Sequence, residues 1–593
     1  VERRINKSLF IGIKAYNAST EERRYVNLAV YGSSEFGESQ KKHHCITPPR
    51  SLRFTERERE NTARVSPPVT RARPRAAPFP RPCVDLYLCA PHHHTMRVPT
   101  LATFLLTTSS SVLSRLGLVA VPRRHFSGQF RRIQQQQRVQ QLGLGRCCYS
   151  RYSANRIMTG ADTFRFADYD CVGFDLDNTL LRYRVGNVIE LEYGIMARFL
   201  VEQRGYSGKH LLEPLDVDFL QKGLIIDFQR GNILKLGPDG TIHQATHGTK
   251  KMAEAEVMAY YGDERKWEVT TEYCENMLVA WNGPLSEKIR TVLDYFDICS
   301  TLIFGRIIDT LDEEAHERIG NYNVWPDVLD SLVFMYSREH FGQNIGGYFQ
   351  QLKQNPDKYL QRSSPKLISF LRELKKTKTT FLVTGSHIDF ANFTASYALG
   401  PDWPELFDVV VGYAKKPGFF TGAKPFIRME GSTETDPLTP SQLERNHVYS
   451  QGNWRDLTVL LQRLAHKENP RYLYIGDNLI QDMYTPAKFT KADTIAIVEE
   501  MAAEGMRDCP ALSHPDARYL QSRFWGSYFV AGTNPLLEEP SLWADLIKRC
   551  ARICVPSMDV LAEYPLDHSY NSFTESVACA DGYYPAEPMT LAN

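Results

Sequence analysis

The sequence predicts an α/β fold in which a parallel sheet carries the functional residues. Four short apolar runs have the composition of strands buried on both faces: residues 171–174, 379–383, 407–411 and 471–475. Each run leads directly into a polar segment, and open parallel sheets bind their ligands at the carboxyl ends of the strands. The 593 residues are sufficient for several domains.

The formal net charge of +1 conceals two regions of opposite charge. Residues 1–161 contain 27 Lys and Arg but 9 Asp and Glu, whereas the rest of the chain has 17 more acidic than basic residues. One uniform globular body is therefore excluded. A hydrophobic content of 42% with 11% aromatic residues fits a globular protein and excludes collagen, coiled coil and acidic disorder.

Residues 1–95 are predicted to be disordered or not native to the working protein. They mix charges, histidines and prolines without periodicity, and the prolines of residues 71–82 would break a helix or a central strand. The basic residues are scattered and no nucleic-acid-binding module is visible, so we expect no nucleic-acid partner.

Residues 96–160 form an Arg-rich segment that resembles a targeting sequence. No acidic residue occurs between Asp85 and Asp162, and lysine is absent from the segment, which is typical of a mitochondrial transit peptide if translation starts at Met96. If Met158 is the start, we expect a cytoplasmic protein. A secretory signal is a third alternative. The run 98–114 is too short and too rich in Ser and Thr to span a membrane, so no membrane partner is expected.

The first chemical motif follows the run 171–174 and reads Asp175-Leu-Asp177-Asn-Thr179. Two carboxylates two residues apart at a strand end can take two different catalytic roles. One can attack phosphorus as a nucleophile, and the other can act as general acid and base. The competing interpretation is a turn with Asx caps after a strand, because the motif also occurs by chance.

Three further polar segments follow later strands. Thr384-Gly385-Ser386 offers hydroxyl and backbone N–H donors for a phosphate. Lys416 can neutralise phosphate charge, and Asp477 with Asp482 can complete an oxygen-rich shell for Mg²⁺. Taken singly, Ser386 could be a helix cap, Lys416 a surface charge and Asp482 a helix-start acid. Their order and common position after strands favour a single site.

Together these motifs resemble the haloacid-dehalogenase-like (HAD) superfamily and, within it, the cytosolic purine 5′-nucleotidase group. The resemblance covers about residues 165–590 and includes the segments 246–250, 416–420, 449–453, 525–529 and 582–585. It implies a doubly wound, Rossmannoid parallel-sheet core with an inserted, mainly helical cap domain. The implied core comprises residues 165–190 and 365–593, including a C-terminal extension, and the implied cap comprises residues 191–364.

The resemblance also implies a role for each motif residue. Asp175 would be the nucleophile and a Mg²⁺ ligand, and Asp177 would be the general acid and base, with its carbonyl on the metal. Asp477 and Asp482 would complete the metal site. The substrate phosphate would be bound by the residues of the second and third motifs, namely Thr384, Gly385, Ser386 and Lys416.

The spacing of the motifs locates the specificity module. The separation from Asp177 to Thr384 is 207 residues, far more than a doubly wound unit needs, so the cap is expected there. The segment 223–235 is expected to form a strand pair or a plain hairpin. The segment 432–438 is expected to be a polar loop, and a helix is expected around residues 457–464.

The chain departs from the purine enzymes at their nucleotide-contacting positions. Where those enzymes have Arg, Asp and His on one cap helix, this chain has Leu329, Val333 and Tyr336, and Gly385 replaces an Asn. We therefore predict a Mg²⁺-dependent phosphomonoester hydrolase acting on a nucleoside 5′-monophosphate or a similar small phosphate. The alternatives are a catalytically inactive scaffold with this fold and a phosphotransferase. Relatives form homo-oligomers, so a homo-oligomer is one expected state of this chain.

Overall fold

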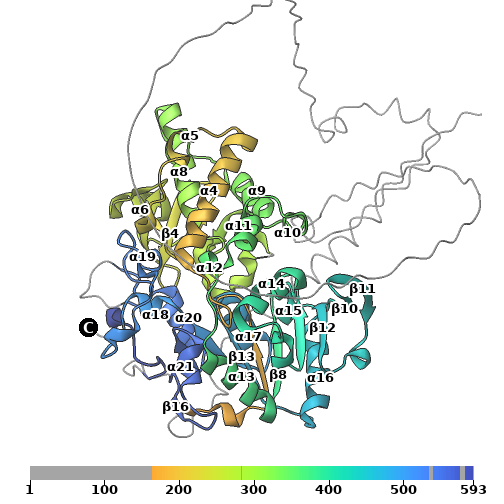
Figure 1. Ribbon diagram of the computed structural model, residues 1–593. Coiled ribbons are helices and arrows are strands. Elements are labelled where there is room, and N and C mark those ends of the chain that lie inside the picture. The colour runs from red at the N-terminus through yellow and green to blue at the C-terminus, as the bar shows by residue number, and fades with distance from the viewer. Residues whose placement is uncertain (1–162, 282, 533–538, 575–580, 592–593) are drawn as a thin grey trace, which may run out of the picture. The chain divides into compact units, whose positions relative to one another are not determined.

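The computed structural model describes residues 163–593, except 282, 533–538, 575–580 and 592–593 (Figure 1). The segments 1–95 and 96–160, with their predicted disorder and targeting function, lie outside the described residues. Within the described range, no helix is both long enough and apolar enough to cross a membrane.

A nine-stranded sheet forms the core and contains all four expected strands. Its central strand β2 (Cys171–Phe174) is flanked by β8 (Thr379–Val383) and β13 (Tyr472–Gly476). Seven neighbouring strands are parallel, and the β10–β11 hairpin lies antiparallel at one edge. The other strands are β9 (Val409–Gly412), β10 (Phe426–Glu430), β11 (Thr433–Leu438), β12 (His447–Gln451), β14 (Asp493–Ile497) and β15 (Ile553–Val555). The predicted α/β class with a mostly parallel sheet is confirmed.

The register of the sheet brings three strand ends to one level. Phe174 of β2 pairs with Leu382 of β8 on one side and with Ile475 of β13 on the other. The residues that follow these strands therefore emerge side by side at the carboxyl edge. All residues of β2, β8 and β13 are buried, which explains why these strands show no alternation of apolar and exposed polar residues.

Core helices begin and end where the sequence supplies caps. Helix α13 (Pro365–Thr377) starts after Ser364, whose hydroxyl accepts from the Leu367 N–H, and has proline at its first position. Helix α16 (Trp454–Ala465) covers the helix expected around residues 457–464, and ends at His466 in the left-handed conformation. The expected polar loop over residues 432–438 is wrong, because residues 433–438 form β11 and pair with β10. The solvent-exposed face of an edge strand made this segment look like a loop.

The residues between β2 and β8 contain helices and a second sheet. This five-stranded antiparallel sheet has the order β6-β5-β4-β3-β7. The segment 223–235, where a strand pair or hairpin was expected, contributes the β3–β4 hairpin to it. The strands are β3 (Ile225–Asp227), β4 (Asn232–Leu236), β5 (Ile242–His247), β6 (Lys250–Lys251) and β7 (Ile289–Thr291). The long helices are α4 (Val185–Arg204), α8 (Cys299–Ala315) and α9 (Trp325–Met335). The partition into core and cap at residues 190 and 365 stays a prediction.

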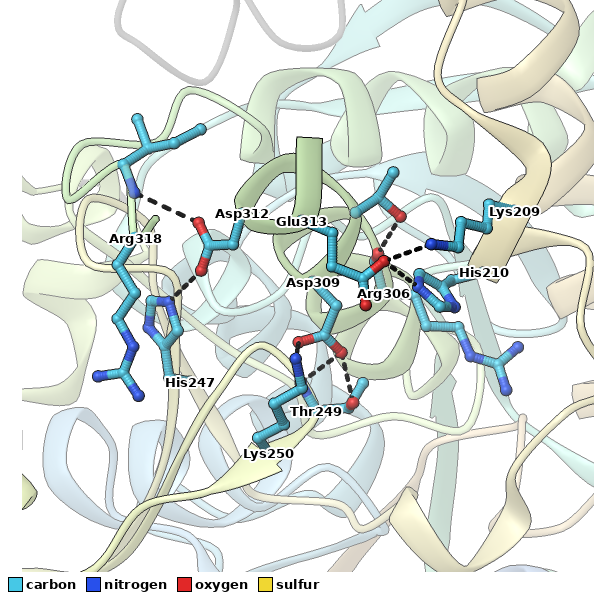
Figure 2. A network of polar contacts seen from close by, with 12 residues as sticks. Lys209, His210, His247, Thr249, Lys250, Arg306, Asp309, Asp312, Glu313 and Arg318 are labelled. Atoms are coloured by element: carbon cyan, nitrogen blue, oxygen red, sulfur yellow. Dashed lines mark hydrogen bonds and ion pairs between the residues drawn. The ribbon is translucent and has the colours of Figure 1, made fainter. Parts of the chain in front are cut away.

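Helix α8 anchors its neighbours through three acidic side chains near its C-terminal end (Figure 2). Asp309 accepts from the backbone N–H and the hydroxyl of Thr249, which fixes the turn after β5. Asp312 binds His247 at 2.8 Å. Glu313 receives both Lys209 (2.7 Å) and His210 (2.9 Å) from α5 (Gly208–Leu211).

Candidate active site

Asp175 and Lys416 form an ion pair at the carboxyl edge of the central sheet. Asp175 directly follows β2, and its backbone N–H donates to Ile475 O of β13, so the neighbouring strand holds it in place. Lys416 lies in the loop after β9, and its Nζ is 2.8 Å from Asp175 Oδ1. The side chains are only 3% (Lys416) and 10% (Asp175) exposed. The interpretation of Lys416 as a solvated surface charge is therefore wrong.

The same ammonium group also binds Asp482, with Nζ 2.7 Å from Oδ1. Burial alone would lower the pKa of Lys416, but Asp175 and Asp482 outweigh it and raise that pKa well above its usual value. Lys416 is thus a fixed positive charge between two carboxylates. The Lys416 ammonium group makes a third contact, with the Tyr474 hydroxyl at 3.3 Å, which further fixes the lysine side chain.

Asp175, Asp477 and Asp482 converge into one acidic cluster. Each offers a carboxylate oxygen, and these three oxygens lie within 4.8 Å of one another. Gly476 is required for this approach, because a Cβ at that position would lie 2.5 Å from Asp482 Cβ. Asp482 is fully buried in the short helix Leu479–Tyr484.

The electrostatics of this cluster show an excess of negative charge. Burial, together with Asp294, Asp175 and Asp482, raises the pKa of Asp477 well above its usual value. Burial also raises the pKa of Asp482 to about 7, with Lys416 opposing the shift. One lysine does not compensate three buried carboxylates. A divalent cation bound at this cluster would compensate part of its negative charge.

Asp177 is held apart from this cluster by hydroxyl groups. Its Oδ2 accepts from Ser386 Oγ at 2.7 Å and lies 3.4 Å from Thr384 Oγ1, while its Oδ1 accepts from Tyr183 OH at 2.8 Å. Burial first, and Asp175 second, raise the pKa of Asp177. A partly buried carboxyl group with a raised pKa and a fixed orientation is suited to give and take a proton.

The residues expected in the second motif lie beside Asp177. Thr384 is fully buried and receives the Ser386 N–H at 3.1 Å. Helix α14 (Ile388–Leu399) is capped at His387, so Ser386 is not its N-cap residue, and its hydroxyl serves Asp177 instead. Gly385 lines a cavity next to Asp177, and open space surrounds the position of its missing Cβ.

Sequence patterns missed several residues that the fold brings to this site. Tyr183, six residues after Asp177, carries no motif, although its spacing from Asp177 could have suggested a contact. Lys222 forms a buried ion pair with Glu500 at 3.0 Å, and its charge lowers the pKa of Asp477. Asp294 follows β7, and its pKa is raised to about 7 by burial and by Asp297. Lys222 and Asp294 come from distant segments, which only the fold relates to the motifs.

The three positions aligned with the purine-contacting residues do not form a common nucleotide-binding surface. Leu329 packs against the main hydrophobic core, and Val333 is 44% exposed. Only Tyr336 lines the cavity beside Asp177, and its hydroxyl donates to Glu192 Oε1 at 2.5 Å.

The donor set fits Mg²⁺. Asp175, Asp477 and Asp482 supply oxygen atoms alone, and hard oxygen ligands are those that Mg²⁺ prefers. The uncompensated negative charge of the cluster favours a divalent cation at the same place. The side chain of Asp177 lies outside this three-residue cluster and points to hydroxyl groups, which leaves only its backbone carbonyl for the metal role implied by the resemblance.

Comparison with known proteins shows the family of this chain. Residues 161–509, more than half of the chain, match the 5′ nucleotidase family. The chain belongs to this family, and the predicted phosphatase/5′-nucleotidase class of enzyme is confirmed at that level. It is also 33% identical over 456 residues to 5′-nucleotidase domain-containing protein 1 of Bos taurus, which covers 73% of this chain and 98% of the relative.

Three further proteins are similar to this chain. The human protein of the same name is 33% identical over 458 residues, with 98% of that protein covered. The rat 5′-nucleotidase domain-containing protein 2 is 28% identical over 323 residues, or 54% of each chain. The match to a solved 2-haloacid dehalogenase from Pseudomonas syringae pv. tomato covers 56% of this chain and 87% of that chain, at 13% identity and with a TM-score of 0.20.

Proposed function

We propose that this chain is a Mg²⁺-dependent phosphomonoester hydrolase that works through an aspartyl-phosphate. Its substrate would be a nucleoside 5′-monophosphate or a similarly small phosphate, as the names of its relatives suggest. The observation that carries the proposal is the position of Lys416, 2.8 Å from Asp175 and 2.7 Å from Asp482, at the carboxyl ends of parallel strands.

The first half of the reaction uses both aspartates of the first motif. A carboxylate oxygen of Asp175 attacks phosphorus, and the bond from phosphorus to the leaving oxygen breaks. Asp177 donates its proton to that oxygen, so an alcohol departs. Lys416 neutralises part of the negative charge of the transferring phosphoryl group.

The second half regenerates the enzyme. Asp177, now a carboxylate, takes a proton from water as the water oxygen attacks phosphorus. The bond between phosphorus and the Asp175 oxygen breaks, which releases inorganic phosphate. Ser386 and Tyr183 keep Asp177 in one orientation through both proton transfers.

The metal would be held by Asp175, Asp477 and Asp482. Bound Mg²⁺ supplies positive charge that reduces repulsion between an anionic nucleophile and an anionic phosphate.

Phosphate release from a panel of monophosphates, by wild type and Asp175→Asn, tests the proposal. We expect Mg²⁺-dependent release by the wild type and at least about a 100-fold loss in the variant, which lacks an anionic nucleophile. Trapping of a ³²P-labelled acid-stable adduct, hydroxylamine-sensitive and absent in Asp175→Asn, would identify the acyl phosphate. Equal release by both proteins would contradict the role of Asp175.

A further inference from the structure

A cavity of about 230 Å³ opens on one side of the proposed general acid. Asp177, Gly385 and Ser386 line it, whereas Asp175 and Lys416 do not. A phosphoester whose phosphorus faces Asp175 must direct its leaving oxygen to Asp177. The cavity is therefore in the position to receive the leaving group, the part of the substrate that distinguishes one phosphate from another.

Phenylalanine and tyrosine rings make up half of the residues that line this cavity. They contact one another edge to face, with ring centroids 4.9 Å apart for Tyr336 and Tyr348 and 5.1 Å apart for Phe349 and Phe390. Such mutually packed rings form stiff walls that favour flat, apolar guests. The rings belong to Phe296, Tyr336, Phe341, Tyr348, Phe349 and Phe390.

Arg338 and Asp389 join two sides of the cavity. Arg338 begins helix α10 (Arg338–Gln343), and Asp389 lies in α14 of the core. Arg338 Nε is 3.1 Å from Asp389 Oδ2, and its Nη2 donates at 2.8 Å to Ser432 O in the β10–β11 turn. Among the residues that line this cavity, all within the described range, Arg338 is the only Lys or Arg. Because its donors are engaged by the core, it holds α10 and the ring of Phe341 in place.

The size of the cavity limits what fits. A volume of 230 Å³ corresponds to about eight water molecules at ~30 Å³ each. It is below the roughly 300–1,000 Å³ of common small-molecule pockets. A single six-membered ring with its linking carbon fits this space, whereas a ribose carrying a fused two-ring base would extend beyond it.

We propose that this aromatic cavity selects a phosphomonoester whose leaving group carries a single flat ring, and that the Arg338–Asp389 pair sets the size limit. This inference rests on the proposed function, because it assigns the substrate class of the same site. It differs from a purine-nucleotide specificity, for which the chain lacks the aligned polar residues.

Matched substrates test the shape preference. Benzyl phosphate and cyclohexylmethyl phosphate have leaving alcohols of similar reactivity and nearly equal size, but only the first has a flat ring. We expect kcat/KM of the full chain with Mg²⁺ to be about three- to ten-fold higher for benzyl phosphate. We also expect it to be at least about ten-fold higher for benzyl phosphate than for guanosine 5′-monophosphate. Equal values for the two ring esters, or a preference for the nucleotide, would overturn the inference.

The failure of this inference is distinguishable from failure of the proposed function. If wild type and Asp175→Asn release equal amounts of phosphate from each of these substrates, the proposed function fails. If the wild type hydrolyses cyclohexylmethyl phosphate or the nucleotide best, and Asp175→Asn does not, only the ring selectivity fails.

Two variants test the walls. Phe341→Leu keeps an apolar side chain but removes a ring, so the ratio of kcat/KM for benzyl over cyclohexylmethyl phosphate should fall toward one. Phe390→Leu should act in the same direction, and thermal unfolding checks that both variants fold. Phe489, an exposed ring (44%) outside this cavity, is the control, and Phe489→Leu should leave the ratio unchanged. An unchanged ratio in both wall variants would contradict the assignment.

The size limit has a separate test. Asp389→Asn removes the charge that holds Arg338, so the cavity should accept larger groups. We expect the ratio of kcat/KM for guanosine 5′-monophosphate over benzyl phosphate to rise several-fold. A ratio equal to that of the wild type would show that the Arg338–Asp389 pair does not set the limit.

Discussion

The ammonium nitrogen of Lys416 lies 2.7 Å from a carboxylate oxygen of Asp482, a residue 66 positions further along the chain. Their side chains are only 3% and 0% exposed, so water does not share in this contact. Asp482 is in turn fixed by the backbone N–H of Asn478 at 3.2 Å. The pair links the β9 loop to the β13 loop, and thereby positions the cation that faces Asp175.

Removal of Lys416 should therefore reduce both stability and activity. In Lys416→Met, two buried carboxylates lose their cation, and the free energy of unfolding without Mg²⁺ should fall by about 3–5 kcal/mol. Urea denaturation in the presence of EDTA measures this. The double variant Lys416→Met/Asp482→Asn should recover part of the stability but none of the phosphate release. If Lys416→Met were as stable as the wild type, the buried ion pair of Lys416 would make no net favourable contribution to stability.

The hydroxyl groups around Asp177 should affect turnover more than substrate binding. Tyr183→Phe and Ser386→Ala each remove a hydrogen bond to this carboxyl group, and such bonds contribute about 1.5–3 kcal/mol when one partner is charged. We expect kcat to fall about ten-fold in each variant with little change in KM, because orientation of the acid matters in the transition state. Tyr472, a buried tyrosine of β13 whose ring packs on Trp454, is a matched control, and Tyr472→Phe should keep wild-type kcat. A rise in KM alone would show that these hydroxyls hold the substrate rather than the acid.

Local sequence patterns predict the core of this protein better than they predict its pocket. The run 379–383 coincides with β8 because Phe381, Leu382 and Val383 are apolar without alternation, as is typical of a strand buried on both faces. The motif residues Asp175 and Lys416 could be assigned to one site from the sequence because both follow parallel strands. Lys222 and Asp294 could not, since their contacts with the site depend on how inserted segments pack. The polar pattern of residues 433–438 led to the wrong expectation of a loop, because an edge strand need not be apolar.

His210 should make stability depend on pH near neutrality. Its two ring nitrogens lie 2.9 Å from Glu313 and 2.9 Å from Glu213 (Figure 2 shows the contact with Glu313), and these hydrogen bonds raise the pKa of His210 above 6.5. Since the folded pKa exceeds the unfolded one, this stabilisation is fully present below about pH 6.5 and is lost as pH rises through the folded value.

The measurement is the free energy of unfolding from pH 5.5 to 8.5 for wild type and His210→Gln. The difference between the two proteins should be largest at the acidic end and should shrink as the pH rises. His316 ends α8 in a left-handed conformation that Asn tolerates, and it is exposed. His316→Asn should therefore follow the wild-type pH profile. A difference independent of pH would mean that His210 contributes only packing.

Gly223 should be far less tolerant of substitution than Gly205, although both have a positive φ, of 84° and 76°. Nothing lies within 4 Å of a Cβ built at Gly205, so Gly205→Ala should cost only the backbone strain of about 1–2 kcal/mol. At Gly223 the same Cβ would lie 1.9 Å from Trp543 Nε1, which also donates to Gly223 O at 3.0 Å. Gly223→Ala must displace this buried indole, so we expect a loss larger by about 1–3 kcal/mol in urea denaturation. Equal losses for the two variants would show that the segment around Trp543 yields without cost, and that this glycine is retained for its φ alone.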